Sequence, residues 1–155
     1  MSRFRTILVP IDFSEHSHAA LELALELARA SGARLHLLHA YEVPLGVIPP
    51  YGVALPEALL AQVRDAAVQR VREVAETVRA AGVACETHVV HAPPVEAIDE
   101  AARSFGADLV VMGTRGLGGL KHVLLGSVAE RTVRTAPCPV LTTRAPRTAR
   151  SEEGS

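Results

Sequence analysis

Aromatic residues and cysteines are scarce in this chain of 155 residues, which has no tryptophan, three phenylalanines, two tyrosines and two cysteines. A core must therefore be built from Leu, Val, Ile and Ala, and hydrophobic residues make up 48% of the sequence. Because Cys85 and Cys138 lie far apart without CxxC spacing, we expect reduced, buried thiols rather than a disulfide or a metal pair. The length fits one domain, since domains usually hold about 100–200 residues.

Long hydrophobic runs and an excess of one charge are also absent. No apolar run approaches the ~20 residues that span a bilayer, and the first residues, MSRFRTILVPI, lack the cleavage site of a signal peptide. The formal net charge is -1, with acidic and basic residues mixed along the chain. This charge composition argues against nucleic acid and membrane surfaces as partners. The missing membrane-spanning run and signal peptide lead us to expect a cytoplasmic protein.

Strand-like and helical patterns alternate along the chain. Short runs rich in β-branched or apolar residues predict five strands, at 6–11, 34–40, 84–90, 108–112 and 138–143. Apolar residues at helical spacing predict four helices, at 14–31, 56–81, 94–105 and 127–136. The alternation predicts an α/β fold, a doubly wound five-stranded parallel sheet with helices on both faces.

The second predicted helix carries the longest apolar stripe. Its inward-facing residues are predicted to be Leu59, Leu60, Val63, Ala67, Val71, Val74 and Val78. After the last strand the sequence becomes polar and has no periodic pattern. We therefore predict one domain over residues 1–144 and a disordered tail over 145–155.

The segment after the fourth predicted strand, GTRGLGGLKHVLLGS, is rich in glycine and more than ten residues long. Connections between a strand and a helix usually take about 2–6 residues, so a loop of this length is usually functional or disordered. Gly113 and Gly116 can adopt positive φ and expose backbone N–H groups to an anion. Gly126 then leads to a helix start where Ser127 can cap and where the helix dipole favours negative charge.

Three side chains in that segment could add positive charge: Arg115, Lys121 and His122. The simpler alternative is a mobile glycine loop followed by an ordinary Ser-capped helix. In a doubly wound sheet, ligands bind beyond the carboxyl ends of the strands where the strand order reverses. If the first and fourth strands are neighbours, the glycine-rich segment meets the turn PIDFS that follows the first strand.

Several well-known site types do not fit the sequence. It contains no GxxxxGK[ST], and the first strand-to-helix turn has no glycine, so neither a P-loop nor a dinucleotide fingerprint is present. It also lacks the GxSxG elbow of a serine hydrolase. Three pairs of histidines lie close enough in sequence to raise the question of a metal site: His16 with His18, His36 with His39, and His88 with His91. Their spacing along a helix or strand turns them to different sides, so we expect ordinary histidines and no metal site.

Asp12 has two possible roles. At the end of a strand its carboxylate can accept from ribose hydroxyls or an adenine amine, or coordinate a metal that bridges phosphates. Alternatively, Asp12 and Glu15 resemble a capping box for the first helix, with Asp in the Ser/Thr position. The two roles are compatible.

The glycine spacing resembles a known signature. Gly113, two residues, Gly116, nine residues, Gly126 and Ser127 reproduce the G-2x-G-9x-G-[ST] pattern of ATP-binding universal stress proteins. The segments ILVPIDFS, ADLVVMGTRG and SVAERTVRTAPCPVL also resemble that family, and the similarity covers Arg5 to about Thr143. It implies the strand order 3-2-1-4-5, ATP in the crevice with or without Mg²⁺ or Mn²⁺, and homodimers joined through the fifth strand.

The same resemblance assigns site residues position by position. The residues implied to bind the nucleotide are Pro10, Ile11, Asp12, Ala40, Met112, Gly113, Arg115, Gly116, Gly126, Ser127, Val128 and Ala129. The chain departs from the family at two places. His91 and Ala92 stand where many members have glycine, and Ala129 stands where some have a hydroxyl residue. Both departures predict weaker binding.

These observations lead to one function hypothesis and two alternatives. The first is a universal stress protein that binds ATP and acts as a nucleotide-sensing stress-response regulator. The second is a dimeric interaction module whose crevice holds no nucleotide. The third is an ATPase, which we expect to be slow at most, because no evident general base accompanies the glycine signature.

Overall fold

A computed structural model describes residues 3–43, 56–115 and 125–145. Gly116, Lys121, His122 and nearly all of the predicted tail therefore lie outside the described residues. The helices and strands, in chain order, are β1 (Thr6–Pro10), α1 (Glu15–Ser31), β2 (Arg34–Tyr41), α2 (Glu57–Ala80), β3 (Cys85–His91), α3 (Pro94–Ser104), β4 (Leu109–Gly113), α4 (Ser127–Thr135) and β5 (Val140–Thr143).

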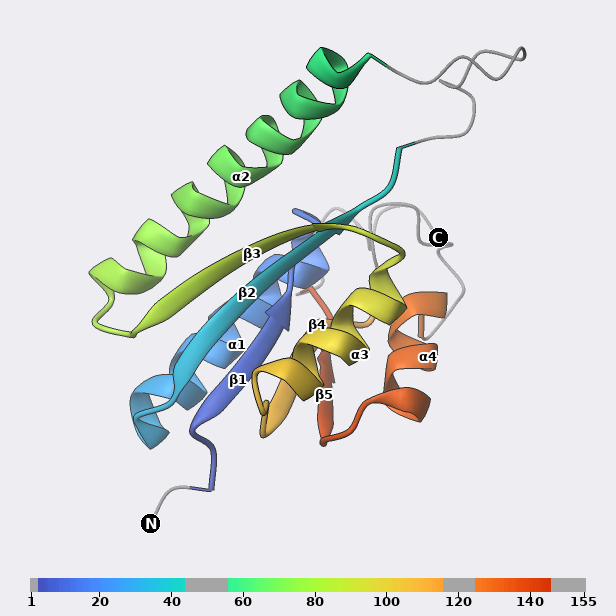
Figure 1. The fold of residues 1–155 in the computed structure, drawn as a ribbon. Coiled ribbons are helices and arrows are strands. Elements are labelled where there is room, and N and C mark those ends of the chain that lie inside the picture. Colours follow the sequence, from blue (N-terminus) through green and yellow to red (C-terminus); the bar gives the residue numbers. More distant parts are fainter. Residues whose placement is uncertain (1–2, 44–55, 116–124, 146–155) are drawn as a thin grey trace, which may run out of the picture.

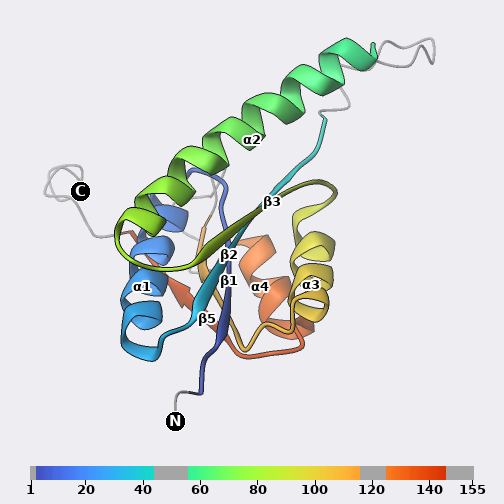
Figure 2. The ribbon, with the colours of Figure 1, turned by 60° about the vertical axis from the view of Figure 1, so that its left-hand side comes forward.

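The five strands form one sheet in the order β3-β2-β1-β4-β5, and all four pairings are parallel. Figures 1 and 2 show α1 and α2 on one face of the sheet and α3 and α4 on the other. The predicted fold class and strand order are thus confirmed. The strand order reverses between β1 and β4, so the segments that follow these two strands begin at the same edge of the sheet.

Strand β1 lies at the centre of both hydrophobic layers. Ile7 and Val9 are fully buried against α1 and α2, whereas Leu8 is fully buried on the face of α3 and α4. Because successive side chains of a strand point to opposite faces, a strand covered on both sides must be apolar throughout. Leu, Val, Ile and Ala make up most of the two clusters, as the composition predicts.

The first helix starts later than the predicted capping box requires. Its N-cap is Ser14, whose hydroxyl accepts a hydrogen bond from the Ser17 N–H (3.2 Å). Asp12 lies two residues earlier and accepts from the Ser14 N–H through Oδ1 (3.0 Å). The chain turns at Phe13, with φ 64°, before the helix begins, so Asp12 stabilises that turn and the pairing of Asp12 with Glu15 as a capping box was wrong.

Helix α2 buries only the second half of its predicted stripe. Ala67, Val71 and Val78 are buried, but Leu59 is 39% exposed and Val63 is 40% exposed. Figures 1 and 2 show the first turns of α2 running out beyond the sheet. The periodic pattern identified the helix correctly, but a helix of 24 residues is longer than the layer it covers, so the expectation for its first turns was wrong.

Both cysteines are free, as expected, with Cys85 buried and Cys138 partly buried. Burial raises the pKa of the Cys85 thiol to about 11 and also raises the pKa of Cys138. Neither group is therefore an activated thiolate. Within the described residues, no helix is long and apolar enough to cross a bilayer.

Two valines of α2 form a matched test of this packing. We expect Val78→Ala to lower the free energy of unfolding by about 2 kcal/mol, because the side chain is fully buried and its removal leaves a cavity. Val63→Ala makes the same chemical change at an exposed position and should alter it by less than about 0.5 kcal/mol. Urea unfolding of both variants measures the difference, and equal losses would contradict the observed limit of the core.

Candidate functional site

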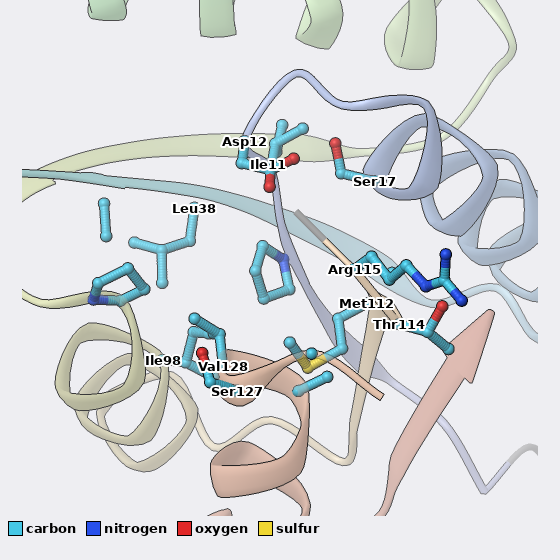
Figure 3. Close-up of a pocket in the computed structure, with 16 residues that line it drawn as sticks. Ile11, Asp12, Ser17, Leu38, Ile98, Met112, Thr114, Arg115, Ser127 and Val128 are labelled. Atoms are coloured by element: carbon cyan, nitrogen blue, oxygen red, sulfur yellow. The ribbon is translucent and has the colours of Figure 1, made fainter. Parts of the chain in front are cut away.

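A pocket of about 360 Å³ opens at the carboxyl ends of β1, β2 and β4, beside the first turns of α3 and α4 (Figure 3). Ligand sites typically measure about 300–1,000 Å³, so the volume suits a small organic molecule. The lining residues are Pro10, Ile11, Asp12, Ser17, Leu38, Ala40, Pro94, Ile98, Met112, Gly113, Thr114, Arg115, Gly126, Ser127, Val128 and Ala129. The pocket therefore lies at the point where the strand order reverses.

Eleven of the twelve predicted site residues line this pocket, and the twelfth, Gly116, is not among the described residues. The eleven come from β1, β2, β4, the loop segments beside them and α4. The fold thus brings these segments together around one cavity. That these residues contact a ligand stays a prediction.

Five lining residues were missed by the sequence reasoning: Ser17, Leu38, Pro94, Ile98 and Thr114. Simple periodicities would have found two of them. Leu38 lies two residues before Ala40 on the same strand face, and Ile98 lies one helical turn after Pro94. Ser17 gave no such signal, because its place depends on where α1 begins.

The lining of the pocket is partly apolar and partly polar. Leu38, Ile98, Met112 and Val128 supply apolar surface, while Asp12, Ser127 and Arg115 supply polar or charged groups. Figure 3 shows Asp12 and Ser127 on opposite sides of the pocket. An amphipathic ligand with an apolar ring and a charged group would match this division.

The first turn of α4 supplies backbone donors on one side. The first hydrogen bond of the helix runs from the Glu130 N–H to the Gly126 carbonyl (2.9 Å), so the N–H groups of residues 127–129 precede the helical ladder. Together with the helix dipole, such N–H groups favour an anion. Gly126 is the N-cap and Ser127 is the first helical residue, so the expectation that the Ser127 side chain caps the helix was wrong.

Arg115 lines the pocket, but Figure 3 shows its guanidinium pointing away from the centre of the cavity. In this conformation its charge does not face the first turn of α4. The backbone N–H groups at the start of α4, rather than the Arg115 side chain, are therefore the hydrogen-bond donors that face the cavity on this side.

Gly113 and Gly126 permit close packing of backbone segments. Gly113 does not have positive φ, contrary to the expectation, since the glycines with positive φ in the described segments are Gly32, Gly82 and Gly106.

A Cβ atom at Gly113 would lie 2.7 Å from the backbone carbonyl carbon of His16, closer than real contacts allow. A Cβ at Gly126 would lie 3.0 Å from the Thr114 carbonyl oxygen, which accepts from the Gly126 N–H at 2.6 Å. The two glycines thus hold the start of α1 and the base of the loop against β4.

The turn after β1 is held under strain at the rim of the pocket. Phe13 has φ 64°, a left-handed conformation that costs a residue with a side chain about 1–3 kcal/mol. The Arg70 guanidinium lies over the Phe13 ring at 3.8 Å, and His39 packs against the same ring at 4.8 Å between centroids. His39 Nδ1 also lies 2.8 Å from the Ile11 carbonyl oxygen. These contacts position Asp12, whose Oδ2 has no hydrogen-bond partner among the described residues.

A second polar group lies on β2 and β3, and none of its residues lines the pocket. One imidazole nitrogen each from His36 and His88 and one carboxylate oxygen from Glu86 lie within 4.8 Å of one another, close enough to hold a metal ion. Burial lowers the pKa of both histidines, which are therefore neutral at pH 7. The expectation of ordinary histidines rested on spacing along single strands and helices, whereas His36 and His88 meet across two strands.

The fold and the pocket together define a class: a doubly wound parallel α/β protein with a ligand-sized pocket at its topological switch point. A sequence model of the universal stress protein family matches residues 3–144. The chain therefore belongs to the universal stress protein family.

Curated and solved relatives agree with this assignment. The chain is 40% identical to the universal stress protein in the QAH/OAS sulfhydrylase 3′ region of Thermus aquaticus, over 91% of this chain and 99% of the relative. It resembles the solved UspA of Lactobacillus plantarum with a TM-score of 0.77 and 26% identity, covering 93% of this chain and 100% of that one. A universal stress protein solved in complex with cAMP is 28% identical with a TM-score of 0.69, covering 92% of this chain and 98% of its own.

The packing role of Gly113 can be tested by Gly113→Ala. We expect a loss of about 1–3 kcal/mol in the free energy of unfolding, because the added methyl group overlaps the rigid backbone of His16. Gly126→Ala meets its nearest atom at a longer distance, 3.0 Å, and should cost less. Chemical denaturation gives the ranking, and a neutral Gly113→Ala would show that the segments are free to separate.

Proposed function

We propose that this universal stress protein binds an adenine nucleotide, ATP, in the pocket at the carboxyl ends of β1, β2 and β4, and acts as a nucleotide-sensing stress-response regulator. The observation that carries the proposal is the first turn of α4, whose N–H groups border a pocket with apolar walls. The cAMP complex of a relative supports an adenine nucleotide as the ligand class.

The division of the pocket suggests how the nucleotide lies. The adenine ring packs between the apolar side chains, with Leu38 and Ala40 on one wall. The ribose lies near Asp12, whose Oδ2 is available to accept from a hydroxyl group. The phosphates reach the N–H groups of residues 127–129.

The two departures from the family pattern affect this arrangement unequally. Ala129 is 2% exposed and lacks a hydroxyl group, but its backbone N–H still belongs to the first turn of α4. Ala92 packs against the hydrophobic cluster of α3 and α4, where its methyl group takes space that glycine would leave open. We therefore propose that binding is weaker than in members with glycine and a hydroxyl residue at these positions.

Binding, rather than rapid turnover, is the activity that we propose. Asp12 is the only carboxylate among the described lining residues, and it stands across the pocket from Ser127 (Figure 3). Fast phosphoryl transfer needs a nucleophilic water positioned at the terminal phosphate, which a carboxylate at the ribose end does not provide. Any hydrolysis should therefore be slow.

The phosphate-binding role of α4 is tested by Ser127→Glu. The new carboxylate lies at the first position of the helix, where it suits the helix dipole and should preserve the fold. It also repels phosphate, so we expect ATP affinity to fall at least ~10-fold in calorimetric titration.

Ser127→Gln is the matched control, because it adds a similar volume without charge and should retain most of the affinity. Adenosine, which has no phosphate, should bind both variants alike. Unchanged ATP affinity in folded Ser127→Glu would remove α4 from the site. If the wild-type protein binds neither ATP nor adenosine, the nucleotide-free interaction module is the better description.

We also propose that the protein forms a homodimer through β5. This strand ends the sheet and, among the described strands, pairs only with β4. An unpaired edge is a template for another strand, and a second copy of β5 would satisfy it. Leu141 and Val133 are also exposed, at 38% and 50%, and would be covered by a partner.

Proline substitutions can test the two edges of β5 one at a time. The carbonyl groups of Pro139 and Thr143 accept from β4, so by alternation the backbone groups of Thr142 point to the outer edge. We expect Thr142→Pro to give folded monomers in light scattering, because it removes an outward N–H group. Leu141→Pro removes an N–H directed at β4 and should instead lower the thermal stability of the whole fold. A folded dimer of Thr142→Pro would place the interface elsewhere.

A further inference from the structure

We propose that His36, Glu86 and His88 form a binding site for a divalent metal ion such as Zn²⁺, which would link the edge strand β3 to β2. The proposal does not depend on nucleotide binding, since none of the three residues lines the pocket. It rests on the register of the two strands, the distances between ligand atoms and the surroundings of the rings.

The register of β2 and β3 places the three residues side by side. His36 pairs with Glu86, and Leu38 pairs with His88. Since residues two apart on a strand share a face, Glu86 and His88 point to the same side of β3. Leu38 belongs to the cluster of α3 and α4, so this is the face that α3 covers. The neighbouring Cys85 belongs to the cluster of the opposite face and does not join the group.

The distances suit a common metal ion. His36 Nδ1 lies 3.0 Å from His88 Nε2 and 3.4 Å from Glu86 Oε2. Ligand atoms around a tetrahedral Zn²⁺ with bonds of about 2.0–2.1 Å are themselves about 3.3 Å apart. The two imidazole nitrogens and the carboxylate oxygen all lie within 4.8 Å of one another, so small side-chain rotations would bring all three into contact with one ion. Two imidazoles and one carboxylate suit zinc and leave its fourth position to water.

The ring of Phe105 holds both histidines in place. It stacks on His36 with 4.7 Å between centroids and on His88 with 4.2 Å. The two imidazole rings are nearly parallel, with an interplanar angle of 12°. Ligands on strands whose rings are already fixed lose little freedom when an ion binds, which favours a built site over an incidental meeting of side chains.

The group is open to solvent on one side, and the carboxylate of Glu86 is held in a suitable orientation. The His36 side chain is 7% exposed and forms the inner part of the group, whereas Glu86 is 51% exposed and faces solvent. Arg34 Nη1 lies 3.5 Å from Glu86 Oε1, so it holds one carboxylate oxygen and leaves Oε2 turned toward His36. An ion can thus enter from the side of Glu86.

Without an ion, the same residues form a hydrogen-bonded group in which one imidazole N–H lies between His36 and His88. That group alone would satisfy the buried nitrogen of His36. The two descriptions differ in a measurable way, because a built metal site binds one zinc ion per chain tightly, whereas a group that serves only as a hydrogen-bonded pair binds zinc no better than isolated surface histidines do.

The test uses the full chain, freed of metal with a chelator and titrated with zinc chloride alone in a buffer without nucleotide. We expect one zinc per chain by calorimetry and by metal analysis after gel filtration. At a hundredfold excess over Kd, zinc should raise the Tm by about 5 °C or more. Failure to bind at about 100 µM zinc would overturn the proposal.

Variants locate the ion. His88→Gln and Glu86→Gln should each raise the Kd for zinc at least ~10-fold, and the exposed Glu86→Gln should fold even if His88→Gln does not. His91→Gln, an exposed histidine on the same strand, is the matched control and should bind zinc like the wild type. Equal affinity in wild type and Glu86→Gln, or a loss confined to His91→Gln, would show that zinc binds elsewhere and would refute the site.

Discussion

The arrangement depends on the burial of β1 between β2 and β4. Ile7, Leu8 and Val9 are fully buried, so β1 requires an apolar layer on each face and a strand at each edge. Parallel neighbours on both sides then bring the turn after β1 and the loop after β4 to one edge of the sheet. The pocket exists because these two segments, about 100 residues apart in sequence, leave the sheet side by side.

Close backbone contacts then shape the pocket. Gly113 lets the start of α1 pass directly against the end of β4, and Gly126 lets the start of α4 approach Thr114. These contacts hold the N-terminal end of α4 at the cavity, where its backbone N–H groups are free to donate hydrogen bonds to an anion. The strained turn at Phe13 similarly places Asp12 at the opposite rim. The glycine signature therefore has a packing role at two of its positions, in addition to the phosphate-binding role that we propose for the segment.

The two candidate sites are neighbours on one face of the sheet. The pocket lies at the carboxyl ends of the strands, whereas His36 lies near the start of β2 and His88 lies at the middle of β3, where it pairs with Leu38 of the pocket lining. Helix α3 connects these regions, with Pro94 and Ile98 in the pocket lining and Phe105, which follows the helix, stacked on the histidines. Helix α3 and its C-cap residue thus contribute to both candidate sites, although the sites share no residue.

The element order and the fold class were predictable without coordinates, because apolar periodicity and glycine or proline boundaries are local properties of the chain. The sequence also identified eleven residues that line one pocket, since the family signature preserves their spacing. How much of α2 is buried could not be predicted in this way, because it depends on the extent of the sheet beneath Leu59 and Val63. The capping of α1 by Ser14 and the packing of Gly113 on His16 also needed the folded chain, since both follow from the turn at Phe13. The meeting of His36 with His88 was likewise invisible in the sequence, because strand register joins residues that no local spacing relates.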